Sequence, residues 1–165
     1  MGRRLVLMRH AKSDWSNAGL GDHERPLNGR GRRSTPAVAA ELRARGFVPD
    51  AVASSDSQRT TETWLLLAAE LGLDVEPRWS SDLYLAGPAT ILGAAATLPA
   101  EATCGLILGH NPGMSEAATL LAGLPMELRT ADAALFEADG DAWPGAADRA
   151  AWRLVWLVRS RDLAP

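Results

Sequence analysis

Cysteine is almost absent from this chain of 165 residues, and long hydrophobic runs are missing. The single cysteine, Cys104, excludes an internal disulfide and a metal site built from several thiolates. No segment approaches the roughly 20 consecutive apolar residues that a membrane span requires. The apolar run at residues 5–8 is also too short for the hydrophobic part of a signal peptide. We therefore expect a cytoplasmic protein that does not enter a membrane.

Sequence signals for metals, nucleotides and nucleic acids are also missing. The three histidines do not lie three or four residues apart, and no cluster of acidic residues accompanies them. Neither of the glycine-rich phosphate-binding patterns of nucleotide folds is present. A net charge of −3 argues against binding to nucleic acid, because such proteins usually carry a basic surplus. We expect no metal, no other cofactor and no nucleic-acid partner, and no pattern indicates an oligomeric state.

Positive charge is concentrated near the N-terminus. Residues 1–45 contain ten lysines and arginines but only four acidic residues, although the whole chain is acidic. This basic third could hold a local anion site. The same arginines could equally form the solvated face of a helix.

The pattern of apolar runs and turn residues predicts an α/β fold. The length suits a single domain over residues 1–165. A strand–helix–strand alternation implies a three-layer sandwich, with a mainly parallel central sheet and helices on both faces. Strands are expected at residues 4–8, 51–54, 75–78, 104–108, 132–138 and 151–158. Helices are expected at residues 28–45, 57–71, 88–98 and from about 112 to 122, and a long loop at 11–27.

Two details of the first helix follow from single residues. Asn28 is a suitable N-cap, and Gly46 is a suitable stop. Pro36 lies inside the expected span, and proline lacks the backbone N–H that a helix interior uses. We therefore expect either an irregular first turn or a later start.

Polar residues follow three of the predicted strands. His10 with Arg9 follows the first, Ser54 and Ser55 lead from the second to Arg59, and His110 follows the fourth. In open α/β sheets, ligands bind at the carboxyl ends of the strands. Two histidines and two arginines would reach this edge from three separate segments of the chain. Packing alone does not readily explain such a grouping. The third histidine, His23, lies in the long loop, where we expect it to be exposed and inert.

These residue types suit phosphoryl transfer. A neutral imidazole is a competent nucleophile toward phosphorus, and a covalent intermediate divides one difficult displacement into two easier ones. The reaction otherwise needs alignment and neutralisation of charge on the phosphoryl oxygens. Arginine is permanently charged and donates paired hydrogen bonds to such oxygens. We expect His10 to be the nucleophile, with Arg59 and His110 contacting the phosphoryl group. Cys104 opens a buried strand and is an improbable nucleophile.

Four segments together resemble the histidine phosphatase (phosphoglycerate mutase-like) superfamily. They are residues 5–13 (LVLMRHAKS), 22–31 (DHERPLNGRG), 54–63 (SSDSQRTTET) and 109–112 (GHNP). The short chain and the form of the first segment are most similar to SixA-type phosphohistidine phosphatases. The resemblance implies that His10 becomes phosphorylated. It further implies a phosphate pocket made by Arg9, Arg59 and His110, with Lys12 and Ser16 as further substrate-binding candidates.

The sequence departs from the family pattern in three places. Ala11 replaces the glycine that usually follows the nucleophile, and Ser16 stands where many relatives carry a phosphate-contacting asparagine. The acidic proton donor of the mutase branch has no secure match, and Asp82 is only a candidate for it. A phosphoramidate protonated on nitrogen needs such an acid less than an ester does.

Three functional hypotheses therefore remain. The leading hypothesis is a metal-independent phosphohydrolase that acts on phosphohistidine in a protein, with a small phosphate ester as the alternative substrate. A phosphate mutase is a second hypothesis, but the 50 residues between Arg59 and His110 offer little sequence for a closed lid. A non-catalytic module that binds phosphoproteins is the third. Specificity is expected from the rim, in the loop at residues 11–27 and at residues 79–88, where Trp15, His23, Trp79 and Tyr84 offer stacking or hydrogen-bonding surface.

Overall fold

The computed structural model describes residues 2–163, and its centre is a six-stranded sheet with strand order β3-β2-β4-β1-β5-β6. Strands β1 to β4 run parallel to one another, whereas β5 is antiparallel to both β1 and β6. The expected α/β sandwich with a mainly parallel sheet is therefore confirmed. The strands are β1 (Arg3–Arg9), β2 (Ala51–Ser55), β3 (Arg78–Ser80), β4 (Cys104–Gly109), β5 (Ala133–Ala138) and β6 (Trp152–Val158).

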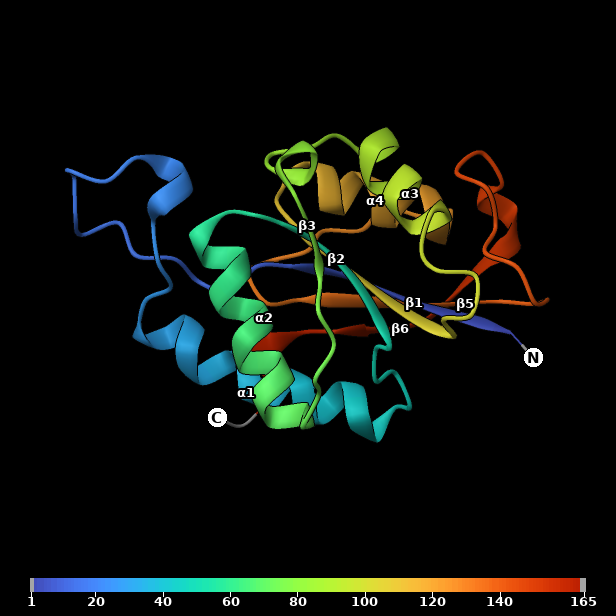
Figure 1. The fold of residues 1–165 in the computed structure, drawn as a ribbon, viewed down its shortest axis with the longest axis horizontal. Helices are drawn as coiled ribbons and strands as arrows, with labels where there is room; N and C mark the ends of the chain where they lie inside the picture. Colours follow the sequence, from blue (N-terminus) through green and yellow to red (C-terminus); the bar gives the residue numbers. More distant parts are fainter. Residues whose placement is uncertain (1, 164–165) are drawn as a thin grey trace.

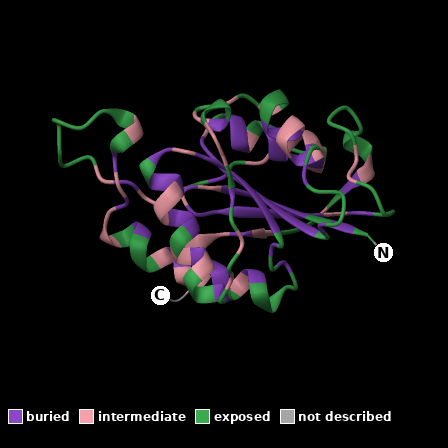
Figure 2. Ribbon diagram, in the orientation of Figure 1, coloured by how far each residue is buried: buried purple, intermediate pink, exposed green. Residues whose placement is uncertain are grey.

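Two pairs of helices cover the two faces of the sheet (Figure 1). Helices α1 (Gly29–Ala44) and α2 (Gln58–Leu71) pack on one face, and α3 (Pro88–Ala96) and α4 (Gly113–Ala122) pack on the other. Side chains of β1 alternate between the two resulting cores. Val6 and Met8 face α1 and α2, whereas Leu5 and Leu7 face α3 and α4. The four inner strands β1, β2, β4 and β5 are consequently the most deeply buried part of the molecule (Figure 2), whereas the edge strands β3 and β6 are partly exposed.

The predicted ends of α1 and α2 are confirmed by their capping geometry. Asn28 Oδ1 accepts a hydrogen bond from the Gly31 N–H at 2.9 Å, and the Ser57 side chain caps α2 in the same way. Helix α2 ends at Gly72, whose φ of 66° lies in the left-handed region that glycine tolerates best. The expected irregularity at Pro36 is wrong, because α1 continues through it. Its N-cap and its buried face hold the helix on both sides of that residue.

The third strand lies further along the chain than predicted. Residues 78–80 form it, whereas we expected residues 75–78. Pairing with β2 determines this position, since Arg78 lies opposite Ala53 and Ser80 opposite Ser55. Val75 packs against the core beneath α1 and α2 instead of joining the sheet. An apolar run by itself therefore identified the segment but misplaced the strand.

The carboxyl ends of β1, β2 and β4 are neighbours at one edge of the sheet. The loop at residues 11–27 projects from this edge (Figure 1) and is fastened at its base, where the Asn28 N–H donates to the Lys12 carbonyl at 3.0 Å. Gly31 is required at this junction, because a Cβ there would lie 2.3 Å from the same carbonyl oxygen. None of the helices among residues 2–163 combines the length and hydrophobicity of a transmembrane helix.

Candidate active site

His10 lies directly after β1, and hydrogen bonds orient its ring. Its Nδ1 lies 2.7 Å from the Ala11 carbonyl oxygen, which can only accept a hydrogen bond. The proton of the neutral ring is therefore assigned to Nδ1, and the lone pair to Nε2. The Ala11 N–H donates to Thr63 Oγ1 at 3.1 Å, which secures this turn against α2. Burial lowers the pKa of His10 to about 3, so the ring is neutral at physiological pH.

Arg59 lies between the two histidines of the cavity. It belongs to the first turn of α2 and is 2% exposed. Its Nε lies 3.4 Å from His10 Nε2, and its Nη2 lies 3.3 Å from His110 Nδ1. The same guanidinium donates to the Asp22 carbonyl at 2.6 Å. A permanent positive charge is thus held beside the lone pair of His10, where it can neutralise charge on a transferred phosphoryl group.

His110 follows β4, and its ring centroid lies 5.2 Å from that of His10. Its Nε2 lies 2.8 Å from Ser55 Oγ, at the end of β2. Because Arg59 is the donor at Nδ1, the proton of His110 is assigned to Nε2 and points at Ser55. Burial, followed by the charge of Arg59, lowers the pKa of His110 to about 3. Both rings are therefore uncharged, and the arginines supply the positive charge of the site.

Arg9 provides a second, half-buried guanidinium at the end of β1. Its Nη1 lies 3.5 Å from the Leu128 carbonyl oxygen, whereas its Nε is buried and has no hydrogen-bond partner among residues 2–163. Desolvation lowers the pKa of Arg9 from its ordinary value. A buried N–H without a partner is costly, and an anionic ligand in the adjacent cavity would supply the missing acceptor.

Asp22 connects the loop at 11–27 to the site, and the sequence interpretation assigned it no role. Its Oδ2 accepts hydrogen bonds from Arg59 Nη2 at 3.0 Å and from the Tyr84 hydroxyl. Its Oδ1 lies 3.0 Å from Arg25 Nη2, and Arg25 in turn lies beneath the exposed ring of Trp15. The Tyr84 hydroxyl and the two guanidinium groups hold the pKa of Asp22 well below its usual range.

These side chains surround a cavity of about 300 Å³, which we call the histidine cavity. Trp15 and Leu85 form part of its rim and are 70% and 55% exposed, respectively. Gly113 allows residues 84–86 to approach α4, because a Cβ there would lie 1.8 Å from the Ala86 carbonyl oxygen. The cavity is lined by Arg9, His10, Lys12, Ser13, Trp15, Asp22, Arg25, Arg59, Leu85, His110, Asn111 and Thr130.

Of the predicted site residues, Arg9, His10, Lys12, Arg59 and His110 come together around this cavity. Three of the missed residues could have been suspected from sequence. Asp22 and Arg25 lie within the second family-like segment, and Tyr84 was named only as rim surface. The Asp22–Arg25 pair is local, but the contacts of Asp22 to Arg59 and Tyr84 span 37 and 62 residues of sequence, so no local pattern encodes these two contacts.

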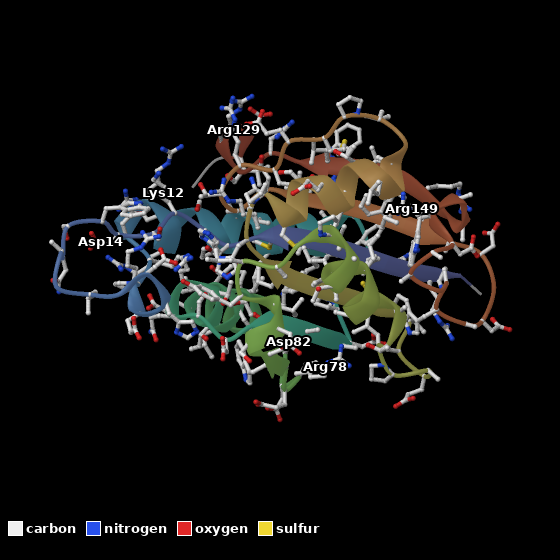
Figure 3. All side chains as sticks on the ribbon, turned by 90° about the horizontal axis from the view of Figure 1, so that it is seen from above. Lys12, Asp14, Arg78, Asp82, Arg129 and Arg149 are labelled. Carbon is white, nitrogen blue, oxygen red and sulfur yellow. The ribbon has the colours of Figure 1, made fainter. Side chains whose placement is uncertain are left out.

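Other predicted residues lie elsewhere. Ser16 is exposed and does not line the histidine cavity; its backbone N–H donates to Asp14 Oδ1 at 2.7 Å. Asp82 lines a separate hollow with Arg78, and Figure 3 shows both on the side of the molecule away from Lys12. His23 is half-buried and not fully exposed, since its Nε2 lies 2.8 Å from Asp56 Oδ1 and its ring packs edge-on against Tyr84; its expected inertness stays a prediction.

Cys104 lies at the opposite end of β4 from His110. Burial raises the pKa of its thiol to about 12, so the thiolate that would be needed for nucleophilic attack does not form near neutral pH. Within residues 2–163, no three His, Cys, Asp or Glu side chains are grouped so that they could hold a metal ion.

Comparisons with known proteins agree with this arrangement. The sequence model of the histidine phosphatase superfamily (branch 1) matches residues 5–80. An uncharacterized chloroplastic protein of Arabidopsis thaliana is 34% identical over 172 residues, which cover 96% of this chain and 78% of that protein. A candidate SixA phosphohistidine phosphatase of Nakamurella multipartitia has a similar structure, with a TM-score of 0.76, 26% identity and coverage of 96% of each chain.

The corresponding candidate SixA protein of Agrobacterium tumefaciens has a TM-score of 0.79 and 25% identity, over 95% of this chain and 97% of that one. The similarity therefore extends over nearly the whole length of both SixA proteins. Sequence, fold and site agree: the chain belongs to the SixA-type branch of the histidine phosphatase superfamily and is a phosphohydrolase.

Proposed function

We propose that this phosphohydrolase removes the phosphoryl group from phosphohistidine in proteins, without a metal, through a phosphorylated His10. The observation that carries the proposal is the charge and protonation state of the side chains that line the cavity. The Nε2 lone pair of His10 lies beside the Arg59 guanidinium, and Asp22 is the only carboxylic acid among the lining residues that the structure describes. That acid is held in its ionised form. The site thus combines a nucleophile and positive charge with a carboxylate that carries no proton to donate.

In the first step, His10 Nε2 forms a bond to phosphorus while the bond from phosphorus to the substrate nitrogen breaks. The electron pair of the broken bond stays on that nitrogen. The Nδ1–H of His10 keeps its hydrogen bond to the Ala11 carbonyl, which stabilises the positive charge that the phosphorylated ring acquires. Arg59 and Arg9 neutralise the phosphoryl oxygens.

In the second step, a water oxygen attacks phosphorus, and the bond to His10 Nε2 breaks with its electron pair returning to the ring. One proton of the water stays on the phosphate, and the other either stays there as well or passes to solvent. The low pKa of His10 favours this release, because the free ring is stable in its neutral form. Both steps use only side chains of the protein and one water molecule.

The leaving group distinguishes between the possible substrates. An alkoxide is a poor leaving group and needs a proton from a nearby acid. Asp22 is ionised, and Asp82, the candidate acid from the sequence, lies in another hollow. When the ring of a phosphohistidine is already protonated, the substrate histidine leaves as a neutral imidazole and needs no such acid. A cavity whose one carboxyl group among the described lining residues is ionised therefore supports a phosphoramidate substrate over an alkyl phosphate ester.

The shape of the rim supports the same class of substrate. Trp15 and Leu85 border an open cavity, and a phosphorylated side chain on a protein surface could reach His10 between them. An open site makes few contacts beyond the phosphoryl group, so small esters should bind weakly. A cytoplasmic location stays a prediction, and one relative is chloroplastic.

The test is a comparison of substrates in the presence of EDTA. A phosphohistidine-bearing protein domain should give a higher kcat/KM than sugar phosphates or nucleotides, mainly through a lower KM, and EDTA should leave the rate unchanged. If one small metabolite is better by tenfold or more, about 1.4 kcal/mol, the protein is a metabolite phosphatase. If chelation abolishes activity and a divalent ion restores it, the mechanism through arginines alone is wrong.

A further inference from the structure

A second hollow adjoins the histidine cavity and is lined mainly by basic side chains. Its volume is about 330 Å³, and it shares Arg9, Lys12 and Thr130 with the histidine cavity. It continues into a third hollow of about 260 Å³, with which it shares residues of α1 and of the segment after β6. We call the second and third hollows together the basic groove. Its cationic residues are Arg9, Lys12, Arg30, Arg33, Arg129 and Arg161.

These charges are largely uncompensated. Lys12, Arg30 and Arg129 form no side-chain ion pair with any residue that the structure describes, and Arg161 approaches only the exposed Asp162, at 4.0 Å. Asp132 is the one acidic residue among the described lining residues of the groove. It is 1% exposed, and its carboxylate already accepts hydrogen bonds from Arg159 and from two backbone N–H groups. The groove is therefore strongly positive in an otherwise acidic protein.

The positions of the cations show the direction of the groove. Lys12 and Arg129 extend from the same end of the molecule, on the side facing away from Asp82 (Figure 3). From there the groove continues to Arg30 and Arg33 in the first turns of α1. These cations come from four separate segments of the chain, so they are not simply the solvated face of one helix. They form a continuous path that leads away from His10.

We propose that the basic groove binds an acidic segment of the phosphoprotein substrate, with its Asp and Glu carboxylates paired to Arg30, Arg129 and their neighbours. The inference rests on the proposed function and specifies its substrate: a phosphohistidine followed or preceded by acidic residues on the protein surface. Arginine binds carboxylates in paired geometry, and exposed arginines can adapt to side chains of different length.

The extent of the groove favours a polypeptide over a second phosphate group. A compact bisphosphate would be satisfied by the cations nearest the histidine cavity, Arg9, Lys12 and Arg129. It would leave Arg30, Arg33 and Arg161 without a role. A chain in extended conformation advances about 3.3 Å per residue, so successive acidic side chains can meet successive cations along the two hollows.

A direct test measures binding without turnover. The probe is a fluorescein-labelled glutamate-rich peptide that carries no phosphohistidine, and fluorescence anisotropy gives its Kd. The wild-type protein should bind it, and the double variant Arg30→Gln/Arg129→Gln should bind it about tenfold more weakly. Arg149→Gln is the matched control, because Arg149 is exposed at the far end of the molecule (Figure 3) and should leave Kd unchanged. Arg30→Lys/Arg129→Lys should restore most of the affinity.

Turnover then distinguishes the groove from the catalytic site. For a phosphohistidine protein with acidic residues beside the phosphohistidine, Arg30→Gln/Arg129→Gln should raise KM about tenfold and leave kcat unchanged. The same protein with those acidic residues changed to Asn and Gln should lose this dependence. Hydrolysis of an aryl phosphate, which has no second charge, should be equal in wild type and variant. Circular dichroism checks that both fold alike.

Several results would overturn the proposal. These are the absence of peptide binding by the wild type, equal loss in Arg149→Gln, and tighter binding of an oligonucleotide or an inorganic polyphosphate than of the peptide. A parallel loss of aryl phosphate hydrolysis would show instead that Arg30 and Arg129 act on the phosphoryl group. If phosphohistidine is not hydrolysed but the peptide binds through Arg30 and Arg129, the proposed function fails and the acidic-ligand site remains.

Discussion

The histidine cavity and the basic groove lie side by side and share three residues, yet they are built differently. In the cavity, His10, Arg59 and His110 are at most 6% exposed, and each is held by hydrogen bonds from neighbouring elements. In the groove, Arg30 and Arg129 are exposed and form no side-chain ion pairs with described residues. One region is organised before a ligand arrives, whereas the other is free to adapt to its ligand.

The difference in burial explains why a charged side chain should contribute more free energy in the histidine cavity than in the basic groove. A charge held in a site from which water is excluded interacts strongly with a transition state and needs no reorganisation. An exposed arginine is screened by water and salt, so each ion pair contributes little. Substitutions in the cavity should therefore change kcat by orders of magnitude, and substitutions in the groove should change KM modestly.

The largest effect is expected from His10→Asn. Removal of the nucleophile should lower kcat by at least about 10⁴-fold, for aryl phosphate and phosphoprotein alike. Asparagine keeps a polar side chain of similar size, so the fold should survive. Steady-state hydrolysis measures the loss, and thermal unfolding checks the fold. A variant that retained even a tenth of the wild-type kcat would show that His10 is not the nucleophile.

Arg59→Met should come next. It removes the guanidinium between the two histidines but keeps a long apolar side chain, so kcat should fall by about 10²–10³-fold, or roughly 2.7–4 kcal/mol. Arg59→Lys keeps the charge but loses the paired geometry, and its kcat should lie between those of Met and wild type. Arg43→Gln, an exposed arginine on α1, is the matched control. Equal rates in Arg59→Met and Arg43→Gln would contradict the role of Arg59.

A smaller loss is expected from Asp22→Asn. We infer that Asp22 is a positioning residue, because its carboxylate accepts hydrogen bonds from Arg59 and Tyr84, which it holds in place. Its neutralisation should lower kcat about tenfold and change KM little, as for other outer residues that orient a catalytic group. Tyr84→Phe removes one of the donors to the Asp22 carboxylate and should have a weaker effect of the same kind. A change confined to KM would place Asp22 in substrate binding instead.

The smallest effect concerns stability at mildly acidic pH. His10 and His110 have folded-state pKa values of about 3, below the unfolded value of 6.5. Between these values the unfolded chain binds more protons, so stability should fall as the pH drops below 6.5. Each histidine contributes at most about 1.4 kcal/mol per pH unit. Urea unfolding at several pH values between about 6.5 and 5 should give a shallower dependence for His110→Gln than for wild type. Identical slopes would mean that the pKa of His110 is the same in the folded and the unfolded protein, which contradicts the lowered value.

Comparison of the sequence expectations with the structure shows what local patterns encode. Apolar runs placed β1 and β4, and side-chain caps fixed the starts of α1 and α2, because these signals act within a few residues. The edge where His10 and His110 meet was also predictable, since parallel strands end together. The sequence placed β3 three residues too early, because the position of this strand depends on its pairing with β2 and not on its own composition.

Residues with long-range contacts were the ones missed. Asp22 looked like part of a loop motif, and only the fold brings it to Arg59 and Tyr84, 37 and 62 residues away. Asp82 was only a candidate for the acid, from its position in the sequence, and it lines a different hollow. The basic character of the first 45 residues was visible, but both readings of it stayed open. The groove draws its cations from that region and from two segments near the C-terminus.

The most direct test of the account is chemical trapping of the phosphoenzyme. Wild-type protein mixed briefly with a phosphohistidine-bearing protein domain and quenched in base should carry one phosphoryl group, labile to acid and stable to base. Fragmentation by electron transfer in a mass spectrometer should place it on His10, and His10→Asn should carry none. A phosphoryl group on His110, His23 or a serine, or an acid-stable label, would contradict the central claim.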